Sequence, residues 1–296
     1  MPPLGKHPHA GLCTATILLR GDSIKHWDNI RDIEETAKSG GVLCLHSAGG
    51  IVHSEEAHDE DKDESSFTHI LYVWFDPGIH RSQLMFPRIE IFEPCQLPMI
   101  QERDMRIRLF MGSYMGRTSP VSTYDADILV LDCHLPPGEE EHVILIPSRM
   151  DAAIVFIPRF GGSGYFGGSR TPISELETGM LSATGNFMSV RSASSLSLHF
   201  FLLAGKSFSL EERTFLLTGH SGAVLATSEE KARSLMEDFE RDPDNFGNFF
   251  DEEAWHKKNE ELDMSYPEES SPPSLTDIPD FPDPGGRLNV TYDDSE

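Results

Sequence analysis

The feature that most constrains the fold is a series of short apolar stretches, rich in β-branched and aromatic residues, that recurs along the chain. Several of them alternate apolar and polar residues with a period of two, as a half-buried strand requires. Clusters of Gly and Pro separate them at the spacing of turns. Many short strands joined in this way predict an all-β sandwich or barrel. The expected strands are 13–19, 68–75, 88–92, 105–110, 127–135, 142–147, 152–158, 195–205 and 215–219.

Two segments have a helical pattern instead. In 228–242, Ala232, Leu235, Met236 and Phe239 fall at i, i+3, i+4 and i+7, and the preceding Thr227 or Ser228 can cap the N-terminus. The pattern of 30–41 is equally compatible with a helix and with a loop that contains one helical turn.

Charge and composition exclude several classes of partner. The net charge is −25 over 296 residues, which argues against direct nucleic-acid binding and against an anionic membrane surface. The apolar runs are shorter than the roughly 20 residues that span a bilayer. The four cysteines include no C-x-x-C pair and are expected to be free thiols in a reducing compartment. We therefore expect a soluble, monomeric protein of the cytoplasm, with the nucleus as a second compartment.

The end of the chain has a different composition. Residues 256–296 contain eleven acidic residues, three basic ones and six prolines. Such a segment has too little apolar surface to offset the entropy lost on folding. It is therefore predicted to be a disordered acidic tail.

Two pairs of polar residues carry the candidate chemistry. His7 and His9 stand two residues apart in KHPHAG, and His53 and Glu55 do so in GIVHSEE. Side chains at i and i+2 of a strand share a face, so neighbouring strands would bring the four together. This mixed set suits Fe(II), Mn, Ni, Co or Zn. With thirteen histidines in the chain the pairs also arise by chance, and His7 and His9 are then surface residues.

Longer stretches carry a resemblance. HPHAGLCTATILLRGDSIKHWD (7–28) and GGVLCLHSAGGIVHSEE (40–56) resemble the pirin family of the cupin superfamily, and similarity to that family continues, in order, to about residue 255. The resemblance implies two stacked jelly-roll-like cupin β-barrels with a C-terminal helix. It implies an N-terminal metal-binding barrel at 1–98, a metal-free C-terminal barrel at 99–215, a helix segment at 216–255 and the tail at 256–296.

The resemblance also implies the ligands. One metal, most often Fe(II), would be held by His7, His9, His53 and Glu55. The C-terminal barrel of pirins lacks a metal. We therefore interpret three scattered histidines, His134, His142 and His199, as structural or solvent-facing.

Three departures from the family pattern put this site in question. Ala10 and Cys13 stand where pirins have Arg and Glu beside the site, and Leu43-Cys44-Leu45 replaces Gln-Trp-Met. Pirins also have about fifty residues before this point. Either the sequence is truncated, or the first barrel is incomplete and leaves an unpaired edge strand that frays and weakens the metal ligands.

Three functional hypotheses follow. The first is an enzyme similar to quercetin 2,3-dioxygenases, in which Glu55 accepts a proton from a flavonol substrate. The second is a non-enzymatic, redox-sensitive transcription cofactor whose partner is a protein, such as a transcription factor. The third is a degenerate pirin without metal or activity.

Overall fold

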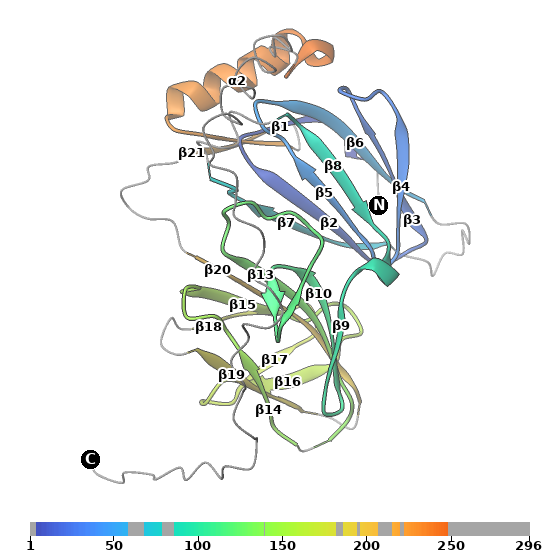
Figure 1. The fold of residues 1–296 in the computed structure, drawn as a ribbon, viewed down its shortest axis with the longest axis vertical. Coiled ribbons are helices and arrows are strands. Elements are labelled where there is room, and N and C mark those ends of the chain that lie inside the picture. The colour runs from blue at the N-terminus through green and yellow to red at the C-terminus, as the bar shows by residue number, and fades with distance from the viewer. Residues whose placement is uncertain are drawn as a thin grey trace, which may run out of the picture. The chain divides into compact units, whose positions relative to one another are not determined.

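The computed structural model describes residues 4–58, 68–78, 86–138, 140–181, 186–193, 196–206, 215–219 and 222–247. The chain is all-β and cupin-like, as predicted, and its strands form two pairs of facing sheets (Figure 1). Within the described residues, hydrogen bonding does not close either pair into a continuous barrel. The predicted tail at 256–296 lies outside the described residues.

The N-terminal pair consists of a six-stranded and a four-stranded sheet. The first has the order β21 (Phe215–Gly219), β22 (Gly222–Ala226), β1 (Leu4–Ala10), β6 (Ile51–His58), β3 (Ser23–Asp28) and β4 (Glu34–Lys38). The second has the order β7 (His69–Phe75), β2 (Cys13–Arg20), β5 (Val42–His46) and β8 (Arg88–Phe92). Aliphatic residues of both sheets pack together between them, among them Ile51 of β6 and Leu45 of β5.

The C-terminal pair repeats this arrangement. One sheet has the order β18 (Thr178–Leu181), β15 (Ala152–Phe156), β20 (Leu198–Gly205), β13 (Ile128–Leu135), β10 (Met105–Met111) and β9 (Met99–Glu102). The other has β14 (His142–Leu145), β19 (Phe187–Ser192), β16 (Ser163–Phe166) and β17 (Thr171–Ser174). A small hairpin, β11 (Ser113–Tyr114) with β12 (Arg117–Thr118), and the 3-10 turns Pro94–Gln96 and Pro243–Asn245 complete the described elements.

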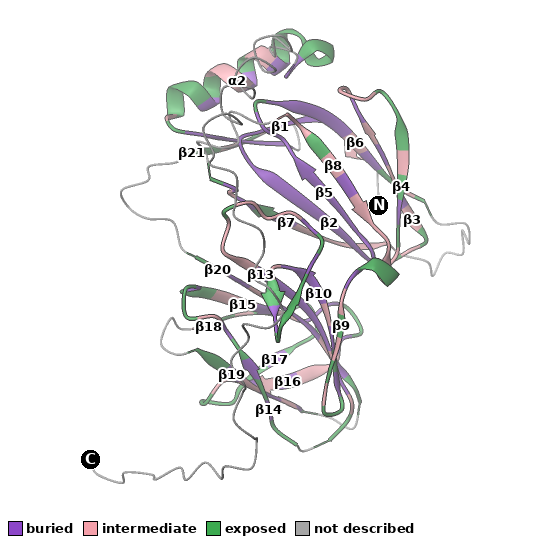
Figure 2. Ribbon diagram, viewed as in Figure 1, coloured by how far each residue is buried: buried purple, intermediate pink, exposed green. Residues whose placement is uncertain are grey.

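The two pairs share a core. Phe201 of β20 and Phe110 of β10 belong to the same buried cluster as Ala15 and Ile17 of β2. Strand β2 is therefore buried on both faces. One face lies toward the six-stranded sheet of the N-terminal pair and the other toward the C-terminal pair, and Figure 2 shows the strand buried over most of its length. This explains why residues 13–18 are all buried, the polar Thr14 and Thr16 included.

The predicted strands are all present, but the segment 30–41 is not a helix. It begins with a single turn, closed by a hydrogen bond from the Asp32 N–H to the Asp28 carbonyl at 3.1 Å, and continues as strand β4, which was not predicted. The buried Asp28 carboxylate accepts hydrogen bonds from the backbone N–H groups of Ile30 and Arg31, which reverses the chain. Ala37 then lies opposite Ile24 of β3 and turns its side chain into the core. Local turn chemistry and burial therefore override the helical pattern.

The predicted C-terminal helix is confirmed as α2 (Glu229–Arg241). Ser228 is its N-cap, and its hydroxyl accepts a hydrogen bond from the Lys231 N–H at 3.2 Å. Met236 and Phe239 pack with Ala10 and Val224, and the helix lies over β21, β22 and β1 (Figure 1). In the part of the chain that the structure describes, no helix has the length and apolarity needed to cross a membrane.

The expected unpaired edge at β1 is wrong. Strand β1 lies inside its sheet, between β6 on one side and β22 on the other. Its pairing with β22 is parallel, with His9 opposite Ala223 and Ala10 opposite Val224. Residues more than two hundred positions away in sequence therefore pair with the strand that carries the first two histidines, which protects that strand against fraying.

Candidate metal centre

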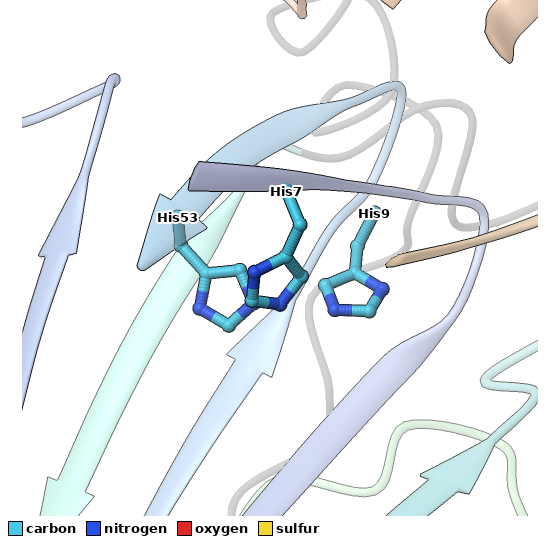
Figure 3. Close-up of side chains that lie close together, drawn as sticks. All are labelled: His7, His9 and His53. Carbon is cyan, nitrogen blue, oxygen red and sulfur yellow. The ribbon is translucent and has the colours of Figure 1, made fainter. Parts of the chain in front are cut away.

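Three of the predicted ligands meet between the sheets of the N-terminal pair. His7 and His9 project from the same face of β1, and His53 of β6 lies directly opposite His7 (Figure 3). The ring centroids are 4.2 Å apart for His7 and His53, 5.0 Å for His9 and His53, and 5.1 Å for His7 and His9. One nitrogen of each ring lies within 4.8 Å of the other two. We call His7, His9 and His53 the imidazole cluster.

Glu55 lies beside this cluster. It follows His53 by two positions on β6, and its Oε1 is 3.8 Å from His53 Nδ1. The Thr16 hydroxyl of β2 donates a hydrogen bond to the same oxygen at 2.9 Å. The structure therefore brings three of the four predicted residues together in the imidazole cluster, whereas the carboxylate of Glu55 groups with His53 and His26.

The ring orientations leave nitrogens available for a metal. His7 Nδ1 donates a hydrogen bond to the Gly5 carbonyl at 2.7 Å, which leaves Nε2 as the nitrogen with a lone pair. His9 Nδ1 lies 3.3 Å from both the carbonyl oxygen and the N–H of Ala223, and its Nε2 has the lone pair in the tautomer that donates to the carbonyl. His53 Nε2 and Glu55 Oε2 are buried without a hydrogen-bond partner among the described residues. Buried polar atoms normally have partners, so these two fit a ligand set for a metal ion.

The pKa shifts of the three histidines also favour metal binding. Burial, followed by the neighbouring imidazoles, lowers the pKa of His9 to about 3 and holds that of His53 well below its ordinary value. Burial also lowers the pKa of His7. All three rings are therefore neutral at physiological pH, which is the form that binds a metal. Burial raises the pKa of Glu55, although the hydrogen bond from Thr16 opposes this.

The sequence analysis missed a fourth histidine in this region. His26 of β3 is fully buried, and its Nδ1 is 3.4 Å from His53 Nδ1. Its Nε2 lies 3.5 Å from Asp28 Oδ2, and the Arg31 guanidinium donates two hydrogen bonds to that same oxygen at 2.8 and 3.0 Å. The signal for it was the same i, i+2 spacing, in His26 and Asp28, but residues 23–28 were not among the predicted strands.

The opposite wall of the site comes from β7. The Trp74 ring lies 5.7 Å from that of His9, edge to face, and 42% of Trp74 is exposed. Tyr72, two residues earlier on the same strand, hydrogen-bonds to Glu55. An aromatic side chain thus separates the imidazole cluster, whose members are only 2–3% exposed, from solvent.

The two departures expected to remove charges beside the site lie elsewhere. Ala10 packs under α2, on the face of β1 opposite to the histidines. Cys13 belongs to the core shared with the C-terminal pair, where its Sγ is 3.0 Å from His46 Nδ1, and His46 Nε2 is 3.0 Å from Glu90. Neither substitution therefore removes a group from the imidazole cluster. Cys13, Cys44, Cys95 and Cys133 are free thiols, as predicted.

Comparisons with known proteins show which sequences and folds this chain is similar to. Residues 2–75 match the family model described as Pirin. Pirin-1 of Arabidopsis thaliana is 27% identical over 68% of this chain, which spans 66% of that relative. Human Pirin is 26% identical over 78% of this chain and 74% of its own length. A crystal structure titled quercetin 2,3-dioxygenase, from Acinetobacter baumannii, superimposes with a TM-score of 0.68 at 21% identity, over 80% of this chain and 77% of that one. The resemblance to the pirin family is thereby confirmed, with residues 2–75 as the segment that matches the family model.

Proposed function

We propose that this chain binds one divalent transition metal through His7, His9, His53 and Glu55, and that it is a dioxygenase of the quercetin 2,3-dioxygenase type. The proposal rests on three neutral, buried imidazoles with a carboxylate beside His53. Two polar atoms of this set, His53 Nε2 and Glu55 Oε2, have no hydrogen-bond partner among the described residues. Three histidines and one carboxylate suit Fe(II) best among common ions, with Zn, Mn, Ni and Co as competitors.

The protein residues supply positioning and proton transfer. A metal held there would act as a Lewis acid toward a substrate oxygen and would supply redox chemistry toward dioxygen. Glu55 Oε2 is the acceptor for the proton of a substrate hydroxyl. Because burial raises the pKa of Glu55, its carboxylate is a stronger base than an exposed one. Thr16 fixes the other oxygen, so Glu55 keeps one orientation.

Trp74 is the place where a planar substrate would arrive. Its exposed ring and its contact with His9 put an aromatic surface at the entrance of the site. A flavonol could stack on that ring, since aromatic pairs stabilise each other in offset and edge-to-face arrangements. The ring must also move for the substrate to reach the imidazole cluster.

The burial of the imidazole cluster favours a second candidate function. A site that is only 2–3% exposed holds a metal well but admits a flavonol only after such a movement. In this second candidate the loaded protein binds a protein partner, such as a transcription factor, and turns over no substrate.

The first experiment is elemental analysis of protein purified without oxygen, followed by a quercetin turnover assay. We expect close to one equivalent of metal at this site and its loss in His53→Ala. The matched control is His58→Ala, because His58 lies on the same strand but is exposed. Equal metal content in His53→Ala and the wild type would refute the site. A loaded protein without turnover would refute the enzyme and leave the protein-binding function.

A further inference from the structure

We propose that Asp132, His134 and His199 form a second metal site, in the C-terminal sheet pair, for a divalent transition metal of the Zn²⁺ type. We call these three residues the Asp132 cluster. It does not depend on the imidazole cluster, because it is built from different strands, β13 and β20. From the sequence, His134 and His199 were interpreted as structural or solvent-facing residues, and Asp132 was not considered.

The strand geometry produces the cluster directly. Asp132 and His134 are two residues apart on β13 and share a face, and His199 lies opposite His134 in the antiparallel ladder with β20. The intervening Leu131, Cys133 and Leu135 face the other way, into the C-terminal core. The cluster shares its face with the buried Val130 and Phe201, which pack in the core that joins the two sheet pairs.

The ligand atoms converge on one point. Asp132 Oδ1 is 2.7 Å from His199 Nε2 and 3.1 Å from His134 Nε2. The two imidazoles stack with their centroids 4.0 Å apart and an angle of 13° between their planes. A metal with bonds of about 2.0–2.2 Å needs donors roughly 3 Å or slightly more apart. Because a metal lies in the plane of each imidazole that binds it, the two stacked rings must tilt relative to each other to admit an ion.

The charge and exposure of the cluster suit an ion that arrives from solvent. Burial alone would raise the pKa of Asp132, but its hydrogen bonds with His134 and His199 lower it well below the ordinary value. The carboxylate is therefore ionised. The side chains of His134 and His199 are 39% and 25% exposed, while that of Asp132 is 10% exposed. The carboxylate thus lies beneath two accessible imidazoles.

Neighbouring cations leave room for the ion. Arg108 of β10 lies opposite Asp132 in the sheet, but its guanidinium donates to the Gly40 carbonyl at 2.8 Å, away from Asp132. Arg106, opposite His134, is exposed. Two histidines with one carboxylate form a donor set that holds Zn²⁺ in catalytic sites and leaves a coordination position open for water or an external ligand.

The test is a titration of metal-free full-length protein with Zn²⁺, repeated with Co²⁺ for its absorption spectrum. The variants are Asp132→Asn, His53→Ala and the two combined. Asp127→Asn is the matched control, because Asp127 lies in the same sheet pair but forms its ion pair with Arg149. We expect His53→Ala to retain one equivalent, and Asp132→Asn to weaken the corresponding site at least about 100-fold, since loss of a ligand exceeds the effect of losing an outer partner. Asp127→Asn should leave binding unchanged.

Each outcome decides the proposal. If His53→Ala binds no metal, or if Asp132→Asn binds as much as the wild type, the second site is refuted. If the wild type binds one equivalent that survives His53→Ala and is lost in Asp132→Asn, this site stands and the proposed N-terminal centre fails. Should Asp132→Asn fail to fold by circular dichroism, the more exposed His134→Ala replaces it with the same expected loss.

Discussion

The N-terminal and C-terminal sheet pairs both place histidines opposite each other on antiparallel strands, yet the two clusters differ in what surrounds them. His7 faces His53 across β1 and β6, and His134 faces His199 across β13 and β20. The first pair lies between two sheets and is buried. The second lies on the sheet face that also carries Phe201 and Val130 of the shared core, where its two imidazoles stay partly exposed around the Asp132 carboxylate. The same strand spacing thus gives a closed, neutral site in one half and an open, charged one in the other.

The difference follows from the layer that covers each polar face. In the N-terminal pair, β7 and β2 lie over the histidines with Trp74 and Thr16, which exclude water and lower the pKa values of the imidazoles. In the C-terminal pair one face of the sheet packs into its own core, and the other packs on the N-terminal pair through Phe201 and Val130 but leaves His134 and His199 partly exposed. The burial and the pKa of these histidines therefore depend on the sheet that faces them as much as on the strand that carries them.

The variant with the largest expected loss of stability lies in the core that joins the two sheet pairs. Phe201→Ala removes a fully buried ring that packs with Phe110 and Ile17, and we expect a loss of about 3–5 kcal/mol in unfolding free energy. Phe200→Ala is the matched variant, because its ring contacts Phe166 within the C-terminal core.

Denaturant titrations followed by tryptophan fluorescence and by circular dichroism measure both variants. Trp27 and Trp74 report on the N-terminal pair. Because the halves share a core, we expect Phe200→Ala to move the fluorescence transition together with the circular dichroism transition. A fluorescence transition that stays at the wild-type position would show that the two sheet pairs unfold independently.

A smaller effect is expected at the carboxylate behind the imidazole cluster. Burial would raise the pKa of Asp28, but hydrogen bonds from His26 and Arg31 lower it to about 2 from 3.8. A lowered folded-state pKa contributes stability above the unfolded value, and this stability is lost as the pH falls from about 4 through 2. We expect Asp28→Asn to cost roughly 2–3 kcal/mol at pH 7 and to flatten the acid limb of the stability curve.

Thermal or urea unfolding between pH 2 and pH 7 measures this effect. Asp32→Asn is the control, because Asp32 is an acceptor for the Trp27 indole N–H and an amide oxygen can replace it. An unchanged slope of stability against pH in Asp28→Asn would contradict the assigned ion pair.

The smallest effect concerns the helix that covers β1. Ser228→Ala removes the N-cap of α2 and should cost about 1 kcal/mol, whereas Ser228→Asp should retain the stability. Since α2 packs on the strand that carries His7 and His9, hydrogen exchange of the β1 amides should increase in Ser228→Ala and not in Ser228→Asp. Equal exchange in both would mean that the helix does not hold this strand in place.

Much of the fold could be predicted from the sequence. The alternating stretches predicted the strands, because the period of two reflects which side chains face the core. The 228–242 pattern predicted α2 for the same reason, with its period of 3.6. The segment 30–41 was mispredicted, because a buried Asp28 sets the turn and a cross-strand partner of Ala37 sets the strand, and neither is visible in a local window.

For the site, the spacing of His7 with His9 and of His53 with Glu55 determined which side chains share a strand face. It did not determine that β1 and β6 are neighbours, that β22 returns to protect β1, or that Trp74 covers the cluster. It also did not bring His199 to Asp132, 67 residues away in sequence. Spacing along a strand is local, whereas strand pairing and burial depend on contacts between distant segments, so only the tertiary structure decided which histidines meet and which of them stay neutral.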